Sequence, residues 1–333
     1  MVKYPTITLE EHFLSDSIEE GHALAQYKGF PSPIHERLKD LSANGFRLKE
    51  MDAGQVSLQV ISHAPGAASS EPAIVSKAND ELANAIQKSP PGRLAGFAAL
   101  PMSHPEKAAE ELERCVKGLK FVGALIDSHL EDGSGSEIYY DNPRFLPVFA
   151  KAEELDVPIY IHPTFATEDM MNLNYNSEAY PSKTSFALSM AGWGWHQDTG
   201  LHFLRLFASG LFDKHPRLKL IIGHMGELLP FQLERIESMI PSWGIENERG
   251  LQEVWRTNLY ITTSGMFSVN PLACLIRNTP LDHILYSVDW PFSSNEQGVK
   301  FLHDIEASGL LKEDEIKGIA YKNAEKLLKV TAK

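Results

Sequence analysis

The sequence predicts an α/β protein: a single (β/α)8 TIM barrel that spans residues 1–333 and ends in closing helices. Eight short segments rich in β-branched and aromatic residues recur along the chain, and helical patterns separate them. Several of these segments are continuously apolar, as expected for parallel strands buried on both faces. A doubly wound sheet is the alternative, but the strand number and the chain length of 333 residues favour the barrel.

The predicted elements alternate along the whole chain. Residues 71–90, 104–120 and 142–156 are typical of helices, with apolar side chains at helical spacing and Pro105 suited to a first helical turn. Residues 295–309 and 322–332 predict the closing helices. Long connections cover residues 14–55 and 165–195, where barrels commonly keep substrate contacts. The predicted strands are 6–13, 56–62, 94–101, 122–128, 158–164, 219–226, 259–265 and 284–291.

Composition excludes several classes of partner. The net charge is −13 and no block of Lys and Arg stands out, so we expect no nucleic-acid partner. Apolar runs are too short to cross a membrane, and the first residues lack the pattern of a signal peptide. The two cysteines, Cys115 and Cys274, form no disulfide or metal pattern. We therefore expect a cytoplasmic protein without a membrane partner.

Polar side chains gather at the C-terminal ends of the predicted strands, where a barrel keeps its chemistry. Glu10 and His12 are two residues apart in TITLEEHF, so both face the same side of the strand, whereas Glu11 faces the other side and is expected to be structural. Together with His162 and Asp289 they could supply oxygen and nitrogen ligands to one divalent ion. Other strand ends carry His63, Asp127 and His224.

A second pair follows the sixth strand. His224 and Glu227 lie in LIIGHMGE, and residues 227–240 predict a helix with Glu227 in its first turn, where its charge would also suit the helix dipole. His224 could be a base, a metal ligand or a support for one. Arg235, two turns further on, could anchor an anion or be a solvated helix charge. His63 could border the pocket or be a structural histidine.

Four motifs taken together resemble the amidohydrolase superfamily: LEEHF, IHP after strand five, GHMGE after strand six and SVDWPF after strand eight. More narrowly, they resemble its non-oxidative decarboxylases, which include the aminocarboxymuconate-semialdehyde, γ-resorcylate, 2,3-dihydroxybenzoate and salicylate decarboxylases. The resemblance covers nearly the whole chain. Many superfamily hydrolases begin with His-x-His, whereas Glu10-x-His12 is similar to the ortho-hydroxybenzoate decarboxylases.

The resemblance implies a role for each matching residue. Glu10, His12, His162 and Asp289 correspond to the shell of one divalent metal ion, which is zinc, manganese or magnesium in the family. Some relatives carry Ala in place of His12, so the number of ligands varies. The family is commonly homo-oligomeric, with the active site near a subunit interface, which implies a homodimer or homotetramer. His224 and Glu227 correspond to an active-site pair, Arg235 to a nearby arginine, and Phe292 to an aromatic residue beside the substrate ring.

The function implied is that of a carbon–carbon lyase (carboxy-lyase). It would decarboxylate a small aromatic acid, an ortho-hydroxybenzoate such as 2,3-dihydroxybenzoate, to CO2 and a phenol, reversibly in concentrated bicarbonate. Asp289 would protonate the ring carbon, while His224 with Glu227 would assist the phenol. Phe292 and Trp290 would pack against the substrate ring and exclude water. The loop residues Tyr27, Phe30, Trp193 and Trp195 would either add to this contact surface or be ordinary packing residues.

Two alternatives remain open at this point. A hydrolase on the same barrel would open a lactone or amide, with Asp289 as base. A binding or scaffold barrel would carry no chemistry, although the intact acidic and imidazole groups at four strand ends argue against it. The sequence does not name the substrate or the metal.

Overall fold

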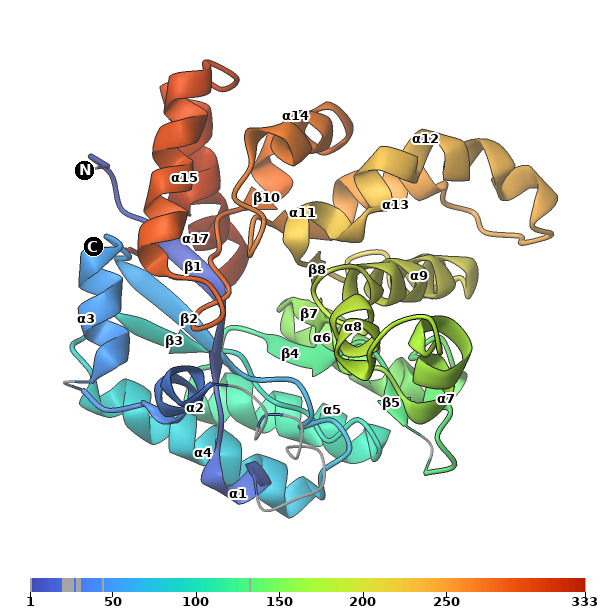
Figure 1. Ribbon diagram of the computed structural model, residues 1–333, viewed down its shortest axis with the longest axis horizontal. Coiled ribbons are helices and arrows are strands. Elements are labelled where there is room, and N and C mark those ends of the chain that lie inside the picture. The colour runs from blue at the N-terminus through green and yellow to red at the C-terminus, as the bar shows by residue number, and fades with distance from the viewer. Residues whose placement is uncertain (1, 20–26, 28–30, 44, 132, 333) are drawn as a thin grey trace.

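The computed structural model describes residues 2–19, 27, 31–43, 45–131 and 133–332. All eight predicted strands are present, and neighbouring strands pair in parallel in chain order (Figure 1). They fall into two runs, which a parallel bridge between Ala98 and Ala124 connects. The first run is β1 (Ile7–Phe13), β2 (Leu58–His63) and β3 (Leu94–Gly96). The second is β4 (Ala124–Asp127), β7 (Ile159–His162), β8 (Leu220–Ile222), β9 (Leu259–Thr262) and β10 (Ile284–Leu285).

The junction between the last and the first strand is made largely by side chains. Glu11 is fully buried and accepts hydrogen bonds from Ser287 Oγ and the backbone N–H of Val288, both at 3.1 Å, and from the N–H of Trp290 at 3.0 Å. The N–H of His12 donates to the carbonyl of Trp290 at 2.8 Å. Glu11 is therefore structural, as predicted, and this strand order with a joined first and last strand is that of a (β/α)8 barrel.

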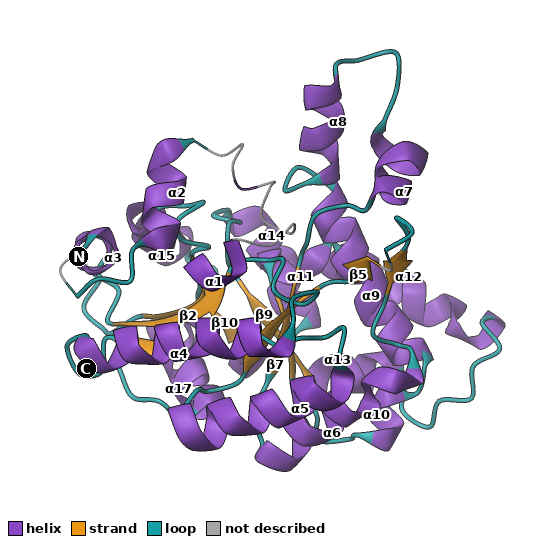
Figure 2. Cartoon of the chain, turned by 90° about the horizontal axis from the view of Figure 1, so that it is seen from below, coloured by secondary structure: helices purple, strands orange, loops and turns teal. Residues whose placement is uncertain are grey.

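Helices surround the strands (Figure 2). The predicted ones are all found, as α4 (Pro72–Lys88), α5 (Pro105–Arg114), α6 (Leu146–Leu155), α12 (Leu229–Met239), α15 (Asn295–Ser308) and α17 (Asn323–Leu328). A π-helical turn, Cys115–Leu119, extends α5. The remaining α-helices of the described residues are α1 (Asp16–Glu19), α2 (Ser32–Lys39), α3 (Phe46–Ala53), α7 (Glu168–Met170), α8 (Ser182–Ser189), α9 (Gly194–Ala208), α10 (Leu211–Lys214), α11 (His224–Glu227), α13 (Leu251–Thr257), α14 (Val269–Asn278) and α16 (Glu313–Lys317).

The structure differs from the predicted elements in three places. The strands are shorter than predicted, most markedly β3, β8 and β10, which pair only over Leu94–Gly96, Leu220–Ile222 and Ile284–Leu285. A short antiparallel hairpin, β5 (Leu130–Glu131) with β6 (Glu137–Ile138), was not predicted. Glu227 does not lie in the first turn of α12 as predicted: it ends the separate turn α11, and α12 begins two residues later.

The core has an inner cluster within the ring of strands. Side chains from β1, β2, β4, β7, β8 and β10 pack there with Ala324, Leu327 and Leu328 of α17. Lys329, which directly follows α17, binds Asp156 just before β7, at 2.6 Å. The closing helix therefore covers the end of the barrel where the strands begin, and leaves the opposite end to the polar strand-end residues. Among the described residues, no helix combines the length and apolar character needed to cross a membrane.

The junction between β10 and β1 predicts a strong dependence on Glu11. Glu11→Ala leaves four donors without their acceptor, the three at the junction and Gln59 Nε2 of β2, so we expect a loss of about 3 kcal/mol in the free energy of unfolding, measured by urea denaturation. Glu36→Ala is the control: Glu36 is exposed on α2 and accepts from Ser32, so its loss is expected to cost less than about 0.5 kcal/mol. Equal losses for the two variants would contradict the role given to Glu11.

Candidate metal centre

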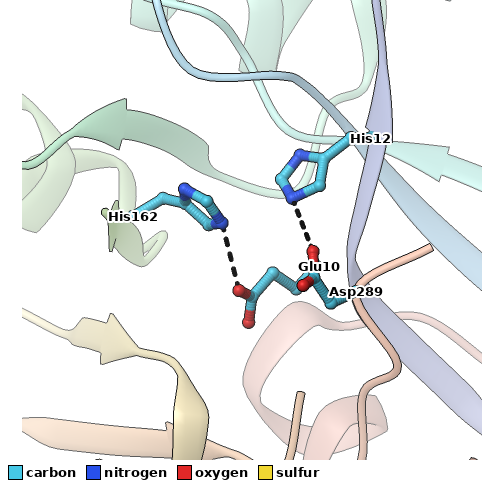
Figure 3. Close-up of side chains that lie close together, drawn as sticks. All are labelled: Glu10, His12, His162 and Asp289. Atoms are coloured by element: carbon cyan, nitrogen blue, oxygen red, sulfur yellow. Dashed lines mark ion pairs between the residues drawn. The ribbon is translucent and has the colours of Figure 1, made fainter. Parts of the chain in front are cut away.

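Four of the residues singled out in the sequence meet at the C-terminal end of the barrel (Figure 3). Glu10 and His12 come from β1, His162 ends β7, and Asp289 follows β10. His162 Nε2 lies 3.1 Å from Glu10 Oε1, and His12 Nε2 lies 3.3 Å from Asp289 Oδ1. The first three side chains are almost fully buried and the Asp289 side chain is 15% exposed.

Each of these residues leaves one polar atom without a hydrogen-bond partner among the described residues. The atoms are Glu10 Oε1, His12 Nε2, His162 Nε2 and Asp289 Oδ1. Buried polar atoms normally have a hydrogen-bond partner. These four atoms lie within 4.8 Å of one another and have none in the described part of the chain, which indicates that one bound group satisfies all four. Two carboxylate oxygens and two imidazole nitrogens are ligands that a divalent cation accepts, so the four residues fit one such ion.

The neighbouring groups turn the imidazoles toward the shared point. His162 Nδ1 donates to the carbonyl of Pro163 at 2.7 Å, so Nδ1 carries the hydrogen and Nε2 presents its lone pair inward. His12 Nδ1 contacts Ser62 Oγ at 3.3 Å, which likewise leaves Nε2 facing the cluster. This is the arrangement expected of histidines that bind a metal ion through Nε2.

Glu10 is oriented in a similar way. Its Oε2 accepts hydrogen bonds from the hydroxyls of Tyr160, Thr262 and Ser264, which leaves Oε1 for the cluster. Gly223 provides the space for this carboxylate, because a Cβ there would lie 3.0 Å from Glu10 Oε2 and 3.1 Å from the Tyr160 hydroxyl. The three hydroxyl residues were not predicted, since Ser and Thr in a strand carry no distinctive spacing.

The electrostatics separate the two carboxylates. Burial alone would raise the pKa of Glu10, but the charges of His224 and His162 outweigh it and hold that pKa well below its usual range. Burial, followed by the charge of Glu10, raises the pKa of Asp289 to about 7. Burial lowers the pKa of His12, which favours a neutral imidazole able to bind a metal ion. Of the two acids, Asp289 is therefore the one suited to carry a proton near neutral pH.

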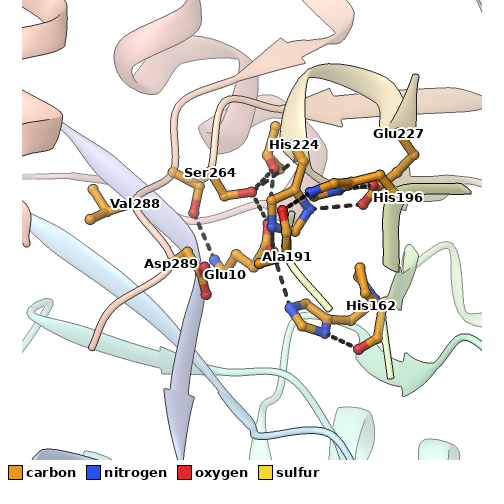
Figure 4. A network of polar contacts seen from close by, with 12 residues as sticks. Glu10, His162, Ala191, His196, His224, Glu227, Ser264, Val288 and Asp289 are labelled. Carbon is orange, nitrogen blue, oxygen red and sulfur yellow. Dashed lines mark hydrogen bonds and ion pairs between the residues drawn. The ribbon is translucent and has the colours of Figure 1, made fainter. Parts of the chain in front are cut away.

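His224 and Glu227 adjoin the cluster (Figure 4). His224 Nε2 lies 3.5 Å from Glu10 Oε1, and His224 Nδ1 lies 2.8 Å from Glu227 Oε1. Burial would lower the pKa of His224, but the carboxylates of Glu227 and Glu10 raise it to about 10. His196 contacts the other oxygen of Glu227. His196, His224 and Glu227 are close enough to hold a second ion, but the Nδ1 atoms of both histidines are already bonded to Glu227.

Several of these residues have left-handed backbone conformations. The φ angles of Asp289, His224 and Glu227 are 71°, 48° and 51°, values that residues with a Cβ rarely adopt. Such conformations persist only where the surroundings enforce them, and they are enriched at functional sites. Asp289 is enforced by Glu11, which binds the N–H groups of the residues on both sides of it.

Residues 34–330 match the family model described as Amidohydrolase. The chain belongs to the amidohydrolase family. It is 46% identical to decarboxylase orsB of Emericella nidulans, over 99% of this chain and 98% of the relative. It is 35% identical to the γ-resorcylate decarboxylase of a Rhizobium species, over 97% and 98% of the two chains. The crystal structure of a dihydroxybenzoic acid decarboxylase from Polaromonas sp. JS666, with bound manganese and the inhibitor 2-nitroresorcinol, superimposes with a TM-score of 0.86 at 33% identity, covering 98% and 97%.

The other predicted residues of this amidohydrolase occupy four different settings. Phe292 borders the metal cluster, with its ring 5.8 Å from that of His12. Trp290 is fully buried, donates to Glu50 at 2.6 Å and lies under the Arg47 guanidinium. His63 uses both ring nitrogens in backbone hydrogen bonds. Arg235 is exposed on α12. Phe292 is thus the member of this set that the structure brings to the cluster.

Of the aromatic residues in the two long loops, some lie near the metal cluster and others lie away from it. The Trp195 ring lies 6.5 Å from His162 and 5.6 Å from Phe165, and Tyr27 is buried 5.4 Å from Phe165. Trp193 is 49% exposed and points its indole N–H at Gln197. Phe30 lies outside the described residues. Trp195 therefore joins Phe292 near the metal cluster, and Phe165 packs against Trp195.

A buried polar network, which was not predicted, lies beside this site. Asp198 accepts hydrogen bonds from Ser128 at 2.7 Å, from His129 at 2.9 Å and from the Tyr139 hydroxyl. His129 and Asp127 line a cavity of about 120 Å³ next to Thr164. No sequence spacing links His129 to Asp198, because the two residues are 69 positions apart.

Metal content tests the cluster directly. We expect the purified protein to bind about one divalent ion per chain, measured by inductively coupled plasma mass spectrometry. His162→Ala and Glu10→Gln each remove one of four converging ligands, so metal affinity should fall by at least about tenfold. His104→Ala, an exposed histidine on the same chain, should retain the metal. Retention of full metal content by His162→Ala and Glu10→Gln would contradict the site.

Proposed function

We propose that this amidohydrolase is a carboxy-lyase that removes the carboxylate from an ortho-hydroxybenzoate. The observation that carries the proposal is the set of four unpartnered ligand atoms, one of them on the acid Asp289, beside the His224–Glu227 pair. The relatives at 46% and 35% identity, both decarboxylases, favour cleavage of a carbon–carbon bond over the hydrolysis of a lactone or amide.

Glu10, His12, His162 and Asp289 would hold the metal ion. When bound, a divalent ion supplies a Lewis acid for the substrate carboxylate and the ortho oxygen. The two imidazoles suit Zn²⁺, and the two carboxylates suit Mn²⁺ and Mg²⁺. The similar Polaromonas structure contains manganese.

Asp289 supplies the proton in this proposal. Protonating the ring carbon that bears the carboxylate forms a carbon–hydrogen bond and interrupts aromaticity. The bond to the carboxylate then breaks, its electron pair returns to the ring, and CO2 leaves. Without a metal ion, burial and the charge of Glu10 raise the pKa of Asp289 to about 7, so a sizeable fraction of this carboxyl group carries a proton near neutral pH.

The remaining residues position the substrate. His224, held by Glu227 at 2.8 Å, faces the cluster through Nε2 and would hydrogen-bond the phenolic oxygen. Phe292 and Trp195 would flank the aromatic ring and exclude water. His63 and Trp290, whose polar atoms are engaged elsewhere, would contribute to the shape of the pocket and not to substrate hydrogen bonds.

Asp289→Asn is the decisive variant. It keeps the shape of the side chain and removes the transferable proton, so we expect CO2 release to fall by at least about a hundredfold. The assay covers 2,3-dihydroxybenzoate, 2,6-dihydroxybenzoate, salicylate and 6-methylsalicylate, with benzoate as the control that lacks the ortho hydroxyl. Metal content is measured on the same samples. Full activity at unchanged metal occupancy would remove Asp289 from the role of proton donor.

We also propose that the protein is a cytoplasmic homo-oligomer. The free thiols Cys115 and Cys274 support a reducing compartment. Large exposed apolar side chains support an interface between copies: Leu173, Phe186, Leu188, Trp193, Leu201, Phe231, Met239 and Trp243. Arg235 lies four residues after Phe231 on α12, so both face the same side of the helix and Arg235 would lie at that interface.

Phe231 tests this assembly because its side chain is 82% exposed. We expect the wild type to run as a dimer or tetramer in size-exclusion chromatography with light scattering, and Phe231→Glu to shift it toward smaller species. Gln252→Glu adds the same charge at an exposed position of α13 and should leave the assembly unchanged. A monomeric wild type, or identical elution of all three proteins, would refute the interface.

A further inference from the structure

Glu227 lies between two imidazoles that come from different elements (Figure 4). His224 Nδ1 is 2.8 Å from its Oε1, and His196 Nδ1, at the start of α9, is 2.7 Å from its Oε2. The carboxylate is 1% exposed, and the two imidazole rings lie 4.7 Å apart. Both oxygens of a buried carboxylate are thus engaged by histidines, one of which faces the metal centre while the other faces away from it.

The second nitrogen of His196 fixes where the hydrogens lie. His196 Nε2 is 2.9 Å from the carbonyl oxygen of Ala191, which only accepts, so Nε2 carries a hydrogen. The contact between Nδ1 and Glu227 Oε2 then needs one further hydrogen, wherever it resides within that bond. Glu227 Oε1 is left as an acceptor, and the contact to His224 is made by a hydrogen on His224 Nδ1.

This order of hydrogen bonds determines which atom of His224 faces the reaction. With Nδ1 donating to Glu227, Nε2 is the nitrogen directed at Glu10 Oε1 and the metal cluster. We propose that His196 is a positioning residue that acts through Glu227 to hold His224 in this orientation. The inference rests on the proposed function for its catalytic meaning.

The backbone of α11 shows why an outside support is needed. His224, Met225, Glu227 and Leu228 all have positive φ angles, so the turn is strained and does not hold its own side chains as a regular helix would. Helix α9 packs closely against it: a Cβ at Gly200 would lie 2.6 Å from the carbonyl oxygen of Glu227. His196, one turn before Gly200 on α9, ties the Glu227 carboxylate to a regular helix.

Two substitutions separate this role from simple packing. In His196→Asn the amide nitrogen takes the place of Nδ1 and can still donate to Glu227. In His196→Gln it takes the place of Nε2 and reaches toward Ala191 instead. We expect His196→Phe and His196→Gln to lower kcat by about tenfold to a hundredfold, with KM and metal content little changed, and His196→Asn to recover most of the loss. His202→Gln, a buried histidine further along α9, measures the cost of losing an imidazole from this helix.

A double-mutant cycle completes the test. In a Glu227→Gln background, His196→Phe should cause no further loss of kcat, because its effect passes through Glu227. The same fold loss in both backgrounds, or equal kcat for the Asn and Gln variants, would overturn the proposal.

A crystal structure of His196→Phe provides a readout that needs no activity. The contact between Glu227 Oε1 and His224 Nδ1 is expected to lengthen beyond hydrogen-bond reach, and an unchanged contact would overturn the proposal. If the wild type releases no CO2 from any hydroxybenzoate, the proposed function fails, and the crystal structure still decides whether His196 positions the pair.

Discussion

The carboxylate of Glu10 is the point on which the rest of the site depends. One of its oxygens is bound by three hydroxyls from β7, β9 and the residues after β9, and the other is left facing two imidazoles and a second acid. A buried carboxylate is costly unless its charge is compensated. The barrel compensates this charge by bringing imidazole and hydroxyl side chains from distant segments to one end of β1. The imidazoles also face the free oxygen of Glu10, where a cation could bind.

A second constraint holds the acid opposite Glu10. Asp289 follows a strand of two residues and has a left-handed backbone, so its own segment does little to fix it. The neighbouring residue of β1, Glu11, fixes it from outside by accepting the N–H groups of Val288 and Trp290. Two adjacent carboxylates of β1 therefore have different roles: Glu10 faces the cluster, and Glu11 holds the backbone on both sides of Asp289.

The fold and the metal cluster could be predicted from the sequence because both follow from regular spacing. Eight strand-like segments predict parallel strands whose ends meet, and Glu10 and His12 must share a face because they are two residues apart. The supporting groups follow no such rule. His196 reaches Glu227 across 31 residues, and the turn that presents His224 and Glu227 is not a regular helix, so the first-turn position predicted for Glu227 was wrong. The position of Trp290 depends on the side chains that pack around it, and the exposure of Arg235 depends on the absence of such neighbours. Sequence spacing shows neither.

The junction between β1 and β10 has a consequence for how the protein is made. Glu11 and its partners are separated by 276 to 279 residues, and the cluster joins residue 10 to residue 289. Contacts of such separation form late in folding, since the loop that they close is nearly the whole chain. During synthesis β1 can pair with β2 early, but Glu11 lacks its partners at residues 287–290 until almost all of the polypeptide has been made. A chain that ended before Ile284, and so lacked about its last fifty residues, would have neither β10 nor Asp289, and the four-residue cluster could not be completed.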